Sequence, residues 1–151
     1  MKGDHIKYTL GYKYQLEEDY TVQVGILPLH PVITHWIVLM PTGWMTFWKG
    51  YAWDGPSGPT IDTPDSMRGS LVHDGIYQLL RLGLLDICFR GKADDLLCQI
   101  CIEDGMVPLR AYTWKEAVGM FAAGCAKTGT EQEVLIAPRP YVNFEPKPLE
   151  A

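Results

Sequence analysis

The stretch Tyr51-Ala-Trp-Asp-Gly-Pro-Ser-Gly-Pro59, followed by Thr63-Pro64-Asp65, marks a change from strands to helices. Gly and Pro recur every two or three residues in its first part, which predicts a loop that runs to about Asp62. Thr63 suits the N-cap of a helix, Pro64 suits its first position, and Asp65 complements the positive end of the helix dipole. We therefore expect strands before this stretch and helices after it.

The residues before the loop are rich in Tyr, Val, Ile and Trp, which favour strands. Two short segments, Glu17–Asp19 and Pro41–Gly43, are typical of turns between paired strands. The sequence therefore predicts an N-terminal antiparallel sheet. Its expected strands are Ile6–Leu16, Tyr20–Leu27, Ile33–Met40 and Trp44–Trp53.

About three helices are expected after the loop. The first runs from Thr63 to near Gly83, and the second runs from about Lys92 to Asp104. Thr113-Trp-Lys-Glu116 has the pattern of a capping box, which starts or reinforces a third helix. Strands followed by helices indicate an α+β fold.

The C-terminal end has a different composition. Residues 137–148 contain four prolines, which exclude a helix and favour an extended polyproline geometry. We therefore divide the chain into one α+β domain, residues 1–136, and an extended Pro-rich tail, residues 137–151. We expect such a tail to be held either by neighbouring subunits of a virion or of a homo-oligomer, or by the sheet of the same chain.

The composition narrows the classes of function. A chain of 151 residues with 47% hydrophobic and 21% charged residues can bury a core of its own. Its net charge of -5 and its scattered basic residues argue against a nucleic-acid partner. Neither a signal peptide nor a run of about 18 apolar residues is visible, so we expect a soluble protein without a transmembrane segment.

The chain has four cysteines, of which Cys98 and Cys101 lie three residues apart in an expected helix. This spacing places two small hydrophobic side chains on one helix face, which favours buried free thiols. The alternative is a zinc site, which would need two further ligands from Cys88, Cys125 or a distant histidine.

The first expected helix carries the residues that are best suited to catalysis or metal binding. A polar stripe of that helix comprises Ser70, Asp74, Tyr77 and Arg81, and His73 lies at the edge of the stripe. On the second helix Asp94 shares its face with apolar residues, so we expect a buried carboxylate. Helices joined by a connection of about ten residues can pack antiparallel, which lets Asp94 reach His73 or Arg81.

These positions suggest a site for hydrolysis. A carboxylate such as Asp94 can hold one ring nitrogen of His73, which leaves the other nitrogen to accept a proton from water or a hydroxyl. Asp74 can bind a divalent cation such as calcium, together with Asp54 and carbonyl groups of the loop that ends at Pro59. His73 and Asp94 are therefore the catalytic candidates, and Asp54 and Asp74 are the candidate metal ligands.

A structural hypothesis uses the same residues. His73, Asp94 and the two arginines Arg81 and Arg90 can form a satisfied polar network that fixes how the helices meet the sheet. The residue pattern alone leaves both hypotheses open.

Three motifs follow one another as they do in a domain family of unknown function that is found in tailed phages and prophages. The loop from Asp54 to Pro59 resembles the Asp-Gly-x-Ser-x-Pro loop of that family. His73-Asp-Gly-Ile-Tyr77 resembles its His-Asp-x-x-Tyr helix, and Arg90 with Ala93-Asp94 resembles its Arg…Ala-Asp helix. The loop and network candidates that join the site are Gly55, Ser57, Gly58, Tyr77, Arg81 and Arg90.

The helix pair is also similar to the catalytic pair of phospholipase A2. In that family the histidine of His-Asp activates water, the adjacent Asp binds calcium, and an Asp from the antiparallel helix orients the histidine. By motif these roles fall on His73, Asp74 and Asp94. The chain departs from that family in its strand-rich first half and in the absence of a cysteine directly after His-Asp.

Two functions follow as expectations. The first is a metal-assisted hydrolase of phage origin that acts on an ester, amide or phosphoester of the host envelope. The second is a non-enzymatic virion or host-interaction component, in which the His/Asp/Arg network is structural and the tail docks to neighbouring subunits. In both cases the phage resemblance implies synthesis in the host cytoplasm, with association with the virion as a further expectation.

Overall fold

The computed structural model describes residues 6–8, 13–56, 62–121 and 135–137. The chain forms two compact units, Gly11–Glu131 and the two ends Met1–Leu10 with Gln132–Ala151. In the unit formed by the two ends, β1 (Ile6–Tyr8) pairs antiparallel with β8 (Leu135–Ala137). Ala137 is the first residue of the predicted Pro-rich tail, and the rest of that tail lies outside the described residues. The division of the chain at residue 136 stays a prediction.

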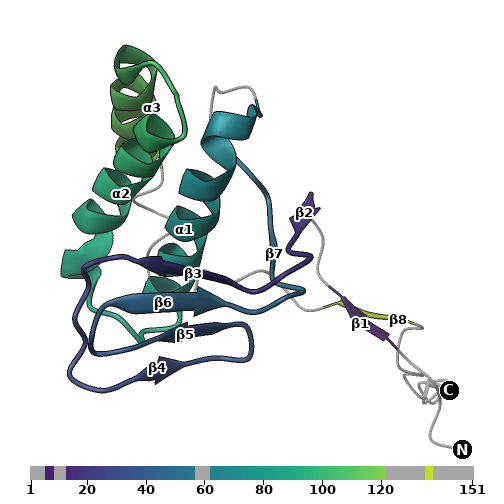
Figure 1. Cartoon of the computed structure of the whole chain (residues 1–151). Helices are drawn as coiled ribbons and strands as arrows, with labels where there is room; N and C mark the ends of the chain where they lie inside the picture. Colours follow the sequence, from purple (N-terminus) through teal and green to yellow (C-terminus); the bar gives the residue numbers. More distant parts are fainter. Residues whose placement is uncertain (1–5, 9–12, 57–61, 122–134, 138–151) are drawn as a thin grey trace, which may run out of the picture. The chain divides into compact units, whose positions relative to one another are not determined.

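The larger unit confirms the predicted N-terminal antiparallel strands (Figure 1). Its main sheet has four antiparallel strands in the order β3–β6–β5–β4. A separate antiparallel pair joins β2 to β7. The strands of this unit are β2 (Tyr14–Gln15), β3 (Tyr20–Gln23), β4 (Val32–Ile33), β5 (Ile37–Leu39), β6 (Trp44–Phe47) and β7 (Ala52–Trp53).

Three predicted strands are divided in the structure. The segment Ile33–Met40 holds the last residue of β4 and the whole of β5, which pair antiparallel through a turn at residues 34–36. The segment Ile6–Leu16 contributes β1 and β2, which belong to different sheets. The segment Trp44–Trp53 contributes β6 and β7, because the chain turns between them. Gly50 adopts a φ of 94°, and the amide of Tyr51 donates to the carbonyl of Trp48 at 3.0 Å. Only glycine adopts such a φ without strain, so the turn ends β6.

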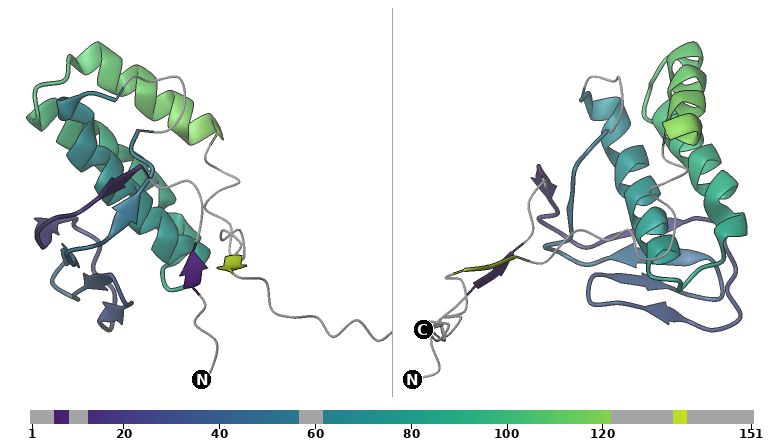
Figure 2. Two further views of the ribbon diagram at one scale, coloured as in Figure 1. Left: turned by 90° about the vertical axis from the view of Figure 1, so that its right-hand side faces the viewer. Right: turned by 180° about the vertical axis from the view of Figure 1, so that it is seen from behind.

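The three predicted helices are α1 (Pro64–Arg81), α2 (Arg90–Glu103) and α3 (Pro108–Phe121). A short 3-10 turn, Ile87–Phe89, precedes α2. Figures 1 and 2 show α1 beside α2, and α2 beside α3, on one side of the four-stranded sheet. Helix α3 begins five residues before the predicted capping box, so Thr113 lies inside it and its hydroxyl donates to the carbonyl of Leu109 at 2.8 Å.

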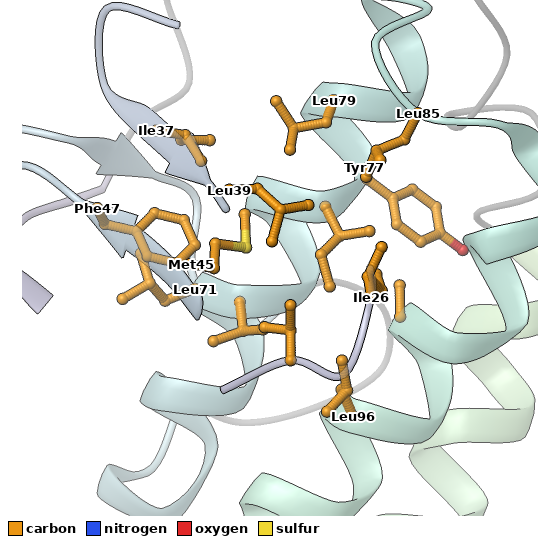
Figure 3. Close-up of a cluster of buried hydrophobic side chains, with 14 of the residues drawn as sticks. Ile26, Ile37, Leu39, Met45, Phe47, Leu71, Tyr77, Leu79, Leu85 and Leu96 are labelled. Atoms are coloured by element: carbon orange, nitrogen blue, oxygen red, sulfur yellow. The ribbon is translucent and has the colours of Figure 1, made fainter. Parts of the chain in front are cut away.

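The core lies between α1 and the inner face of the sheet (Figure 3). Along β5, Ile37 and Leu39 are buried and Val38 is half-buried, as expected for a strand with one covered face. The helix side of this core comprises Leu71, Val72, Ile76, Leu79 and Leu80.

Two glycines of α1 allow close packing on both of its sides. A Cβ atom at Gly75 would lie 2.6 Å from Cζ of Phe47, so the helix backbone can approach the sheet only without a side chain there. A Cβ atom at Gly69 would lie 2.6 Å from Sγ of Cys101 on α2. Helix α1 is therefore held closely against both the sheet and α2.

We predict that Gly75→Ala destabilises the protein. The added methyl group would overlap the fully buried ring of Phe47, and overpacking of this kind costs about 1–3 kcal/mol. Thermal or denaturant unfolding measures the change. Gly91→Ala on α2 is the matched control, because a Cβ atom there meets nothing within 4 Å and alanine favours a helix by about 1 kcal/mol. Equal stability of the two variants would contradict the packing described above.

Candidate functional site

The candidate site is centred on a buried contact between α1 and α2. Nε2 of His73 lies 2.9 Å from Oδ1 of Asp94, within hydrogen-bond distance. The two residues are only 3% and 6% exposed. The predicted burial of Asp94 and its reach to His73 are therefore both observed. The contact crosses the interface of the two neighbouring helices in Figure 1.

Two further predicted residues support Asp94. The hydroxyl of Tyr77 donates to Oδ1 of Asp94 at 2.8 Å, and Nε of Arg90 donates to the Tyr77 hydroxyl at 3.2 Å. Arg90 also donates through Nη2 to the carbonyl of Gly119 on α3. Figure 3 shows the ring of Tyr77 beside the core side chains, with its hydroxyl at the end away from the sheet. The network therefore links all three helices.

Asp74 lies on the other side of the imidazole. Its Oδ1 is 3.7 Å from Nδ1 of His73, which is longer than a hydrogen bond. The Asp74 side chain is 28% exposed, whereas that of His73 is 4% exposed. Both ring nitrogens thus face carboxylates, and only the Asp74 side of the ring borders a partly exposed group.

The charges around His73 and Asp94 shift the pKa of each group. Burial alone would lower the pKa of His73, but the carboxylates of Asp74 and Asp94 outweigh it and raise the pKa above its ordinary value. Burial alone would raise the pKa of Asp94, but hydrogen bonds from His73 and Tyr77 and the charges of His73 and Arg90 lower it. Both shifts favour an ion pair between a protonated imidazole and an ionised carboxylate. Burial also raises the pKa of Tyr77 to about 12, so its hydroxyl stays a donor.

Asp54 follows β7 directly, near Asp74. Burial and the Asp74 charge raise the pKa of Asp54, while Lys13 and Arg81 act to lower it. Oδ1 of Asp54 is buried and has no hydrogen-bond partner among the described residues. An ionised oxygen in that state is costly unless a proton or a cation compensates it.

The second half of α1 leaves only one narrow face partly exposed. From Gly69 to Leu80, every residue is buried except Asp74 and Gln78. These two residues, four positions apart, share one helix face with the half-buried Arg81. The predicted polar stripe is thus confirmed at Asp74 and Arg81, whereas its other two members, Ser70 and Tyr77, are buried.

The remaining candidates have varied positions. Gly55 adopts a φ of 77°, and a Cβ atom there would lie 2.5 Å from Cε2 of Tyr14. The charge of Arg81 lowers the pKa of Asp54. The arginine whose charge lowers the pKa of Asp94 is Arg90. Ser57 and Gly58 lie outside the described residues.

The sequence analysis missed two residues near the site. The hydroxyl of Tyr14 on β2 donates to Oδ2 of Asp62 at 2.6 Å, and Gly119 accepts from Arg90. No motif marks either residue. Gly119 takes part through its backbone carbonyl, which any residue type carries.

The described part of the chain includes three of the four cysteines and can be searched for groups of metal ligands. Cys98 and Cys101 are buried free thiols, as predicted. Within residues 6–8, 13–56, 62–121 and 135–137, no three His, Cys, Asp or Glu side chains are grouped closely enough to form a metal site on their own. A cation at Asp54 and Asp74 would therefore need oxygen ligands from the backbone as well.

Comparison of the chain with protein-family models, with curated proteins and with solved structures gives no match. Among the described helices, none combines the length and the apolar character needed to cross a membrane. The resemblances to the phage domain family and to phospholipase A2 stay predictions from the motifs.

We predict that the His73 and Asp94 pair makes stability depend on pH. The pKa of His73 is raised above 6.5. Its ion pair therefore contributes fully to the free energy of unfolding below that pH, and the contribution is lost as pH rises through the raised pKa. The pKa of Asp94 is lowered below 3.8. Its contribution to the free energy of unfolding is therefore present above that pH and is lost as pH falls through the lowered pKa. The melting temperature, followed by circular dichroism, should be highest between these limits.

The His73→Gln variant should lose the alkaline decrease in melting temperature, because the titrating imidazole is gone. His35→Gln is the matched control, since His35 is exposed on the surface. An alkaline decrease that persists unchanged in His73→Gln would contradict the assignment.

Proposed function

We propose that this chain is a metal-assisted hydrolase in which His73 is the general base, Asp94 orients it and Asp74 is a cation ligand. One observation carries the proposal. Asp94 holds Nε2 of His73 at 2.9 Å, while Nδ1 faces a partly exposed carboxylate at a distance too long for a hydrogen bond. A base needs this asymmetry, because one nitrogen must be fixed while the other accepts a proton.

The hydrogen bonds define the tautomer of the neutral imidazole. A carboxylate accepts a hydrogen bond, so Nε2 carries the proton opposite Asp94, and Nδ1 keeps its lone pair. In the reaction Nδ1 takes a proton from water or a hydroxyl group as the oxygen attacks the substrate. Tyr77 and the Arg90 charge keep Asp94 ionised, so Asp94 stabilises the imidazolium that forms.

The chemistry of Asp54 and Asp74 fits a hard cation such as calcium, which takes carboxylate and backbone oxygens in flexible geometry. The support is the buried oxygen of Asp54 that lacks a partner among the described residues, beside the charge of Asp74. When bound, the cation would supply positive charge to the carbonyl or phosphoryl oxygen under attack. Asp54 and Asp74 would hold it, together with backbone carbonyls.

The substrate class follows from the chemistry and from the motif resemblance. A general base beside a hard cation suits an ester, amide or phosphoester. The resemblance to a phage domain family makes the host envelope the proposed source of that substrate. Solvent and substrate would reach Nδ1 from the Asp74 side, because Asp94 occupies the other side of the ring.

One observation favours a second function, a non-enzymatic virion or host-interaction protein. The imidazole is enclosed between two carboxylates, and their charges raise its pKa, which favours the protonated form that cannot act as a base. In this function the network of His73, Asp94, Tyr77 and Arg90 only fixes the helices, and the Pro-rich tail binds neighbouring subunits.

We predict that Asp74→Asn separates the two functions. In the hydrolase, loss of this carboxylate should reduce the rate about 100-fold or more, while the melting temperature changes by only a few degrees because Asp74 is partly exposed. The measurement is hydrolysis of chromogenic esters, anilides and phosphodiesters and of phospholipid vesicles, with calcium present. Asp95→Asn is the matched control, because Asp95 is 60% exposed and pairs with Lys115 on the surface.

A wild-type chain that hydrolyses none of these substrates would overturn the hydrolase. A marked loss of stability in His73→Gln, together with that result, would support the structural function.

We also predict that calcium raises the melting temperature of the wild-type chain, because a ligand that binds only the folded state stabilises it. Asp54→Asn should abolish the shift, since it removes the charge of the carboxylate whose buried Oδ1 has no partner within the described part of the chain. Asp19→Asn, at an exposed position, should keep it. A calcium effect of equal size in all three proteins would exclude a site at Asp54.

A further inference from the structure

The face of the four-stranded sheet opposite the core exposes large apolar side chains. On β5 and β6 the buried residues alternate with exposed ones, so Trp36, Met40, Trp44 and Trp48 point away from α1. Their exposures are 38%, 42%, 49% and 42%, and Ile33 on β4 is 68% exposed. The outward residues, called the Trp face below, are Thr21, Gln23, Ile33, Trp36, Val38, Met40, Trp44, Thr46 and Trp48.

The strand register arranges the Trp face in rows. The middle row crosses all four strands, because Thr21 pairs with Thr46, Thr46 with Val38, and Val38 with Ile33. The hydroxyl groups of Thr21 and Thr46 are 2.9 Å apart, which places both side chains on the same face. Apart from Ile33 at the edge, this row has small side chains.

Larger side chains flank the middle row on both sides. On one side the amide of Met40 donates to the carbonyl of Trp44 at 2.9 Å, and on the other the amide of Trp48 donates to the carbonyl of Trp36 at 2.9 Å. Each row is about 7 Å from the next, because residues on one face of a strand are two positions apart. The Trp face therefore has a row of mostly small side chains between two rows of larger ones.

One tryptophan is already held in place. A Cβ atom at Gly50 would lie 2.9 Å from Cζ3 of Trp36, so the indole packs directly on the backbone there. The imidazole of His35 meets the same indole edge to face, with ring centroids 4.5 Å apart. A fixed aromatic side chain loses little entropy on binding, which favours its use as an interface anchor.

The charge distribution indicates what covers the Trp face. None of its nine residues is charged, whereas the chain as a whole carries a net charge of -5. Two copies can meet through this face without placing like charges opposite each other. An acidic or basic partner would find no charge on the face to pair with.

We infer that the Trp face is the contact between two copies of this chain, packed sheet against sheet about a twofold axis. Stacked sheets lie about 10 Å apart, and a twofold contact uses the same surface on both copies. In this contact the large side chains of Met40 and Trp44 on each copy would pack over the row of smaller side chains from Thr21 to Ile33 on the other. The inference does not depend on the hydrolase, because the helices that carry His73 and Asp94 lie on the opposite side of the sheet (Figure 2).

Sedimentation velocity over a concentration series tests this inference on the full chain. The wild type should show a monomer–dimer equilibrium, and Trp44→Glu should weaken the dimer by at least about 30-fold in dissociation constant. Thr46→Arg is a second variant, which places a charge in the middle row. Leu109→Glu is the matched control, because Leu109 is 77% exposed on α3 and should leave the dimer unchanged.

Circular dichroism confirms that each variant is folded before its oligomeric state is compared. A wild type that stays monomeric at every concentration would overturn the inference. So would a dimer that survives in both Trp44→Glu and Thr46→Arg. If the wild type is monomeric and its tryptophan fluorescence responds to an envelope saccharide, the face instead binds sugar, and the inference also fails. None of these measurements depends on hydrolytic activity.

Discussion

The buried contact between the His73 imidazole and the Asp94 carboxylate determines how α1 meets α2. A buried charge without its partner would cost several kcal/mol, so neither helix can rotate or slide without breaking the pair. Gly69 lets the helices approach closely enough for the contact to form. Near the opposite ends of the two helices, Arg68 donates to both carboxylate oxygens of Asp104 at 2.9 Å. The two contacts fix the register of the helix pair.

The same constraint determines which part of α1 is left for chemistry. One side of the helix packs on the sheet through Gly75, and another packs on α2 through His73. The narrow face that remains carries Asp74 and Gln78, followed by Arg81. Asp54 follows β7 and lies beside this face. The charge of Asp74 on α1 therefore raises the pKa of Asp54. Chemistry on this face would depend on how tightly the core holds α1.

The sequence could predict features that depend on local chemistry or on helical periodicity. Thr63-Pro64 marked the start of α1, and the helix positions indicated that Asp94 would be buried and would reach either His73 or Arg81, of which the structure shows His73. Alternation could show that Trp44 and Trp48 share a face, but it could not show that the helices cover the opposite face. The effect of the Arg81 charge on the Asp54 carboxylate was also beyond prediction, because the approach of Asp54 depends on how the strands and α1 pack. The capping pattern at Thr113 misplaced the start of α3, although Pro108 at its first position is the same local signal that marks α1 at Pro64.

The two functions proposed for the site differ in how the charge of Asp74 is used. If Asp74 interacts only with His73, two carboxylates raise the pKa of the imidazole, and the protonated ring serves as a structural ion-pair partner. If Asp74 is a cation ligand, its charge acts less on His73, and the ring keeps the single carboxylate partner that a general base requires. Among the described residues Oδ1 of Asp54 has no hydrogen-bond partner, which favours the second arrangement. A buried carboxylate oxygen without a proton, donor or cation costs free energy, and Asp74 is the charge beside it that raises its pKa.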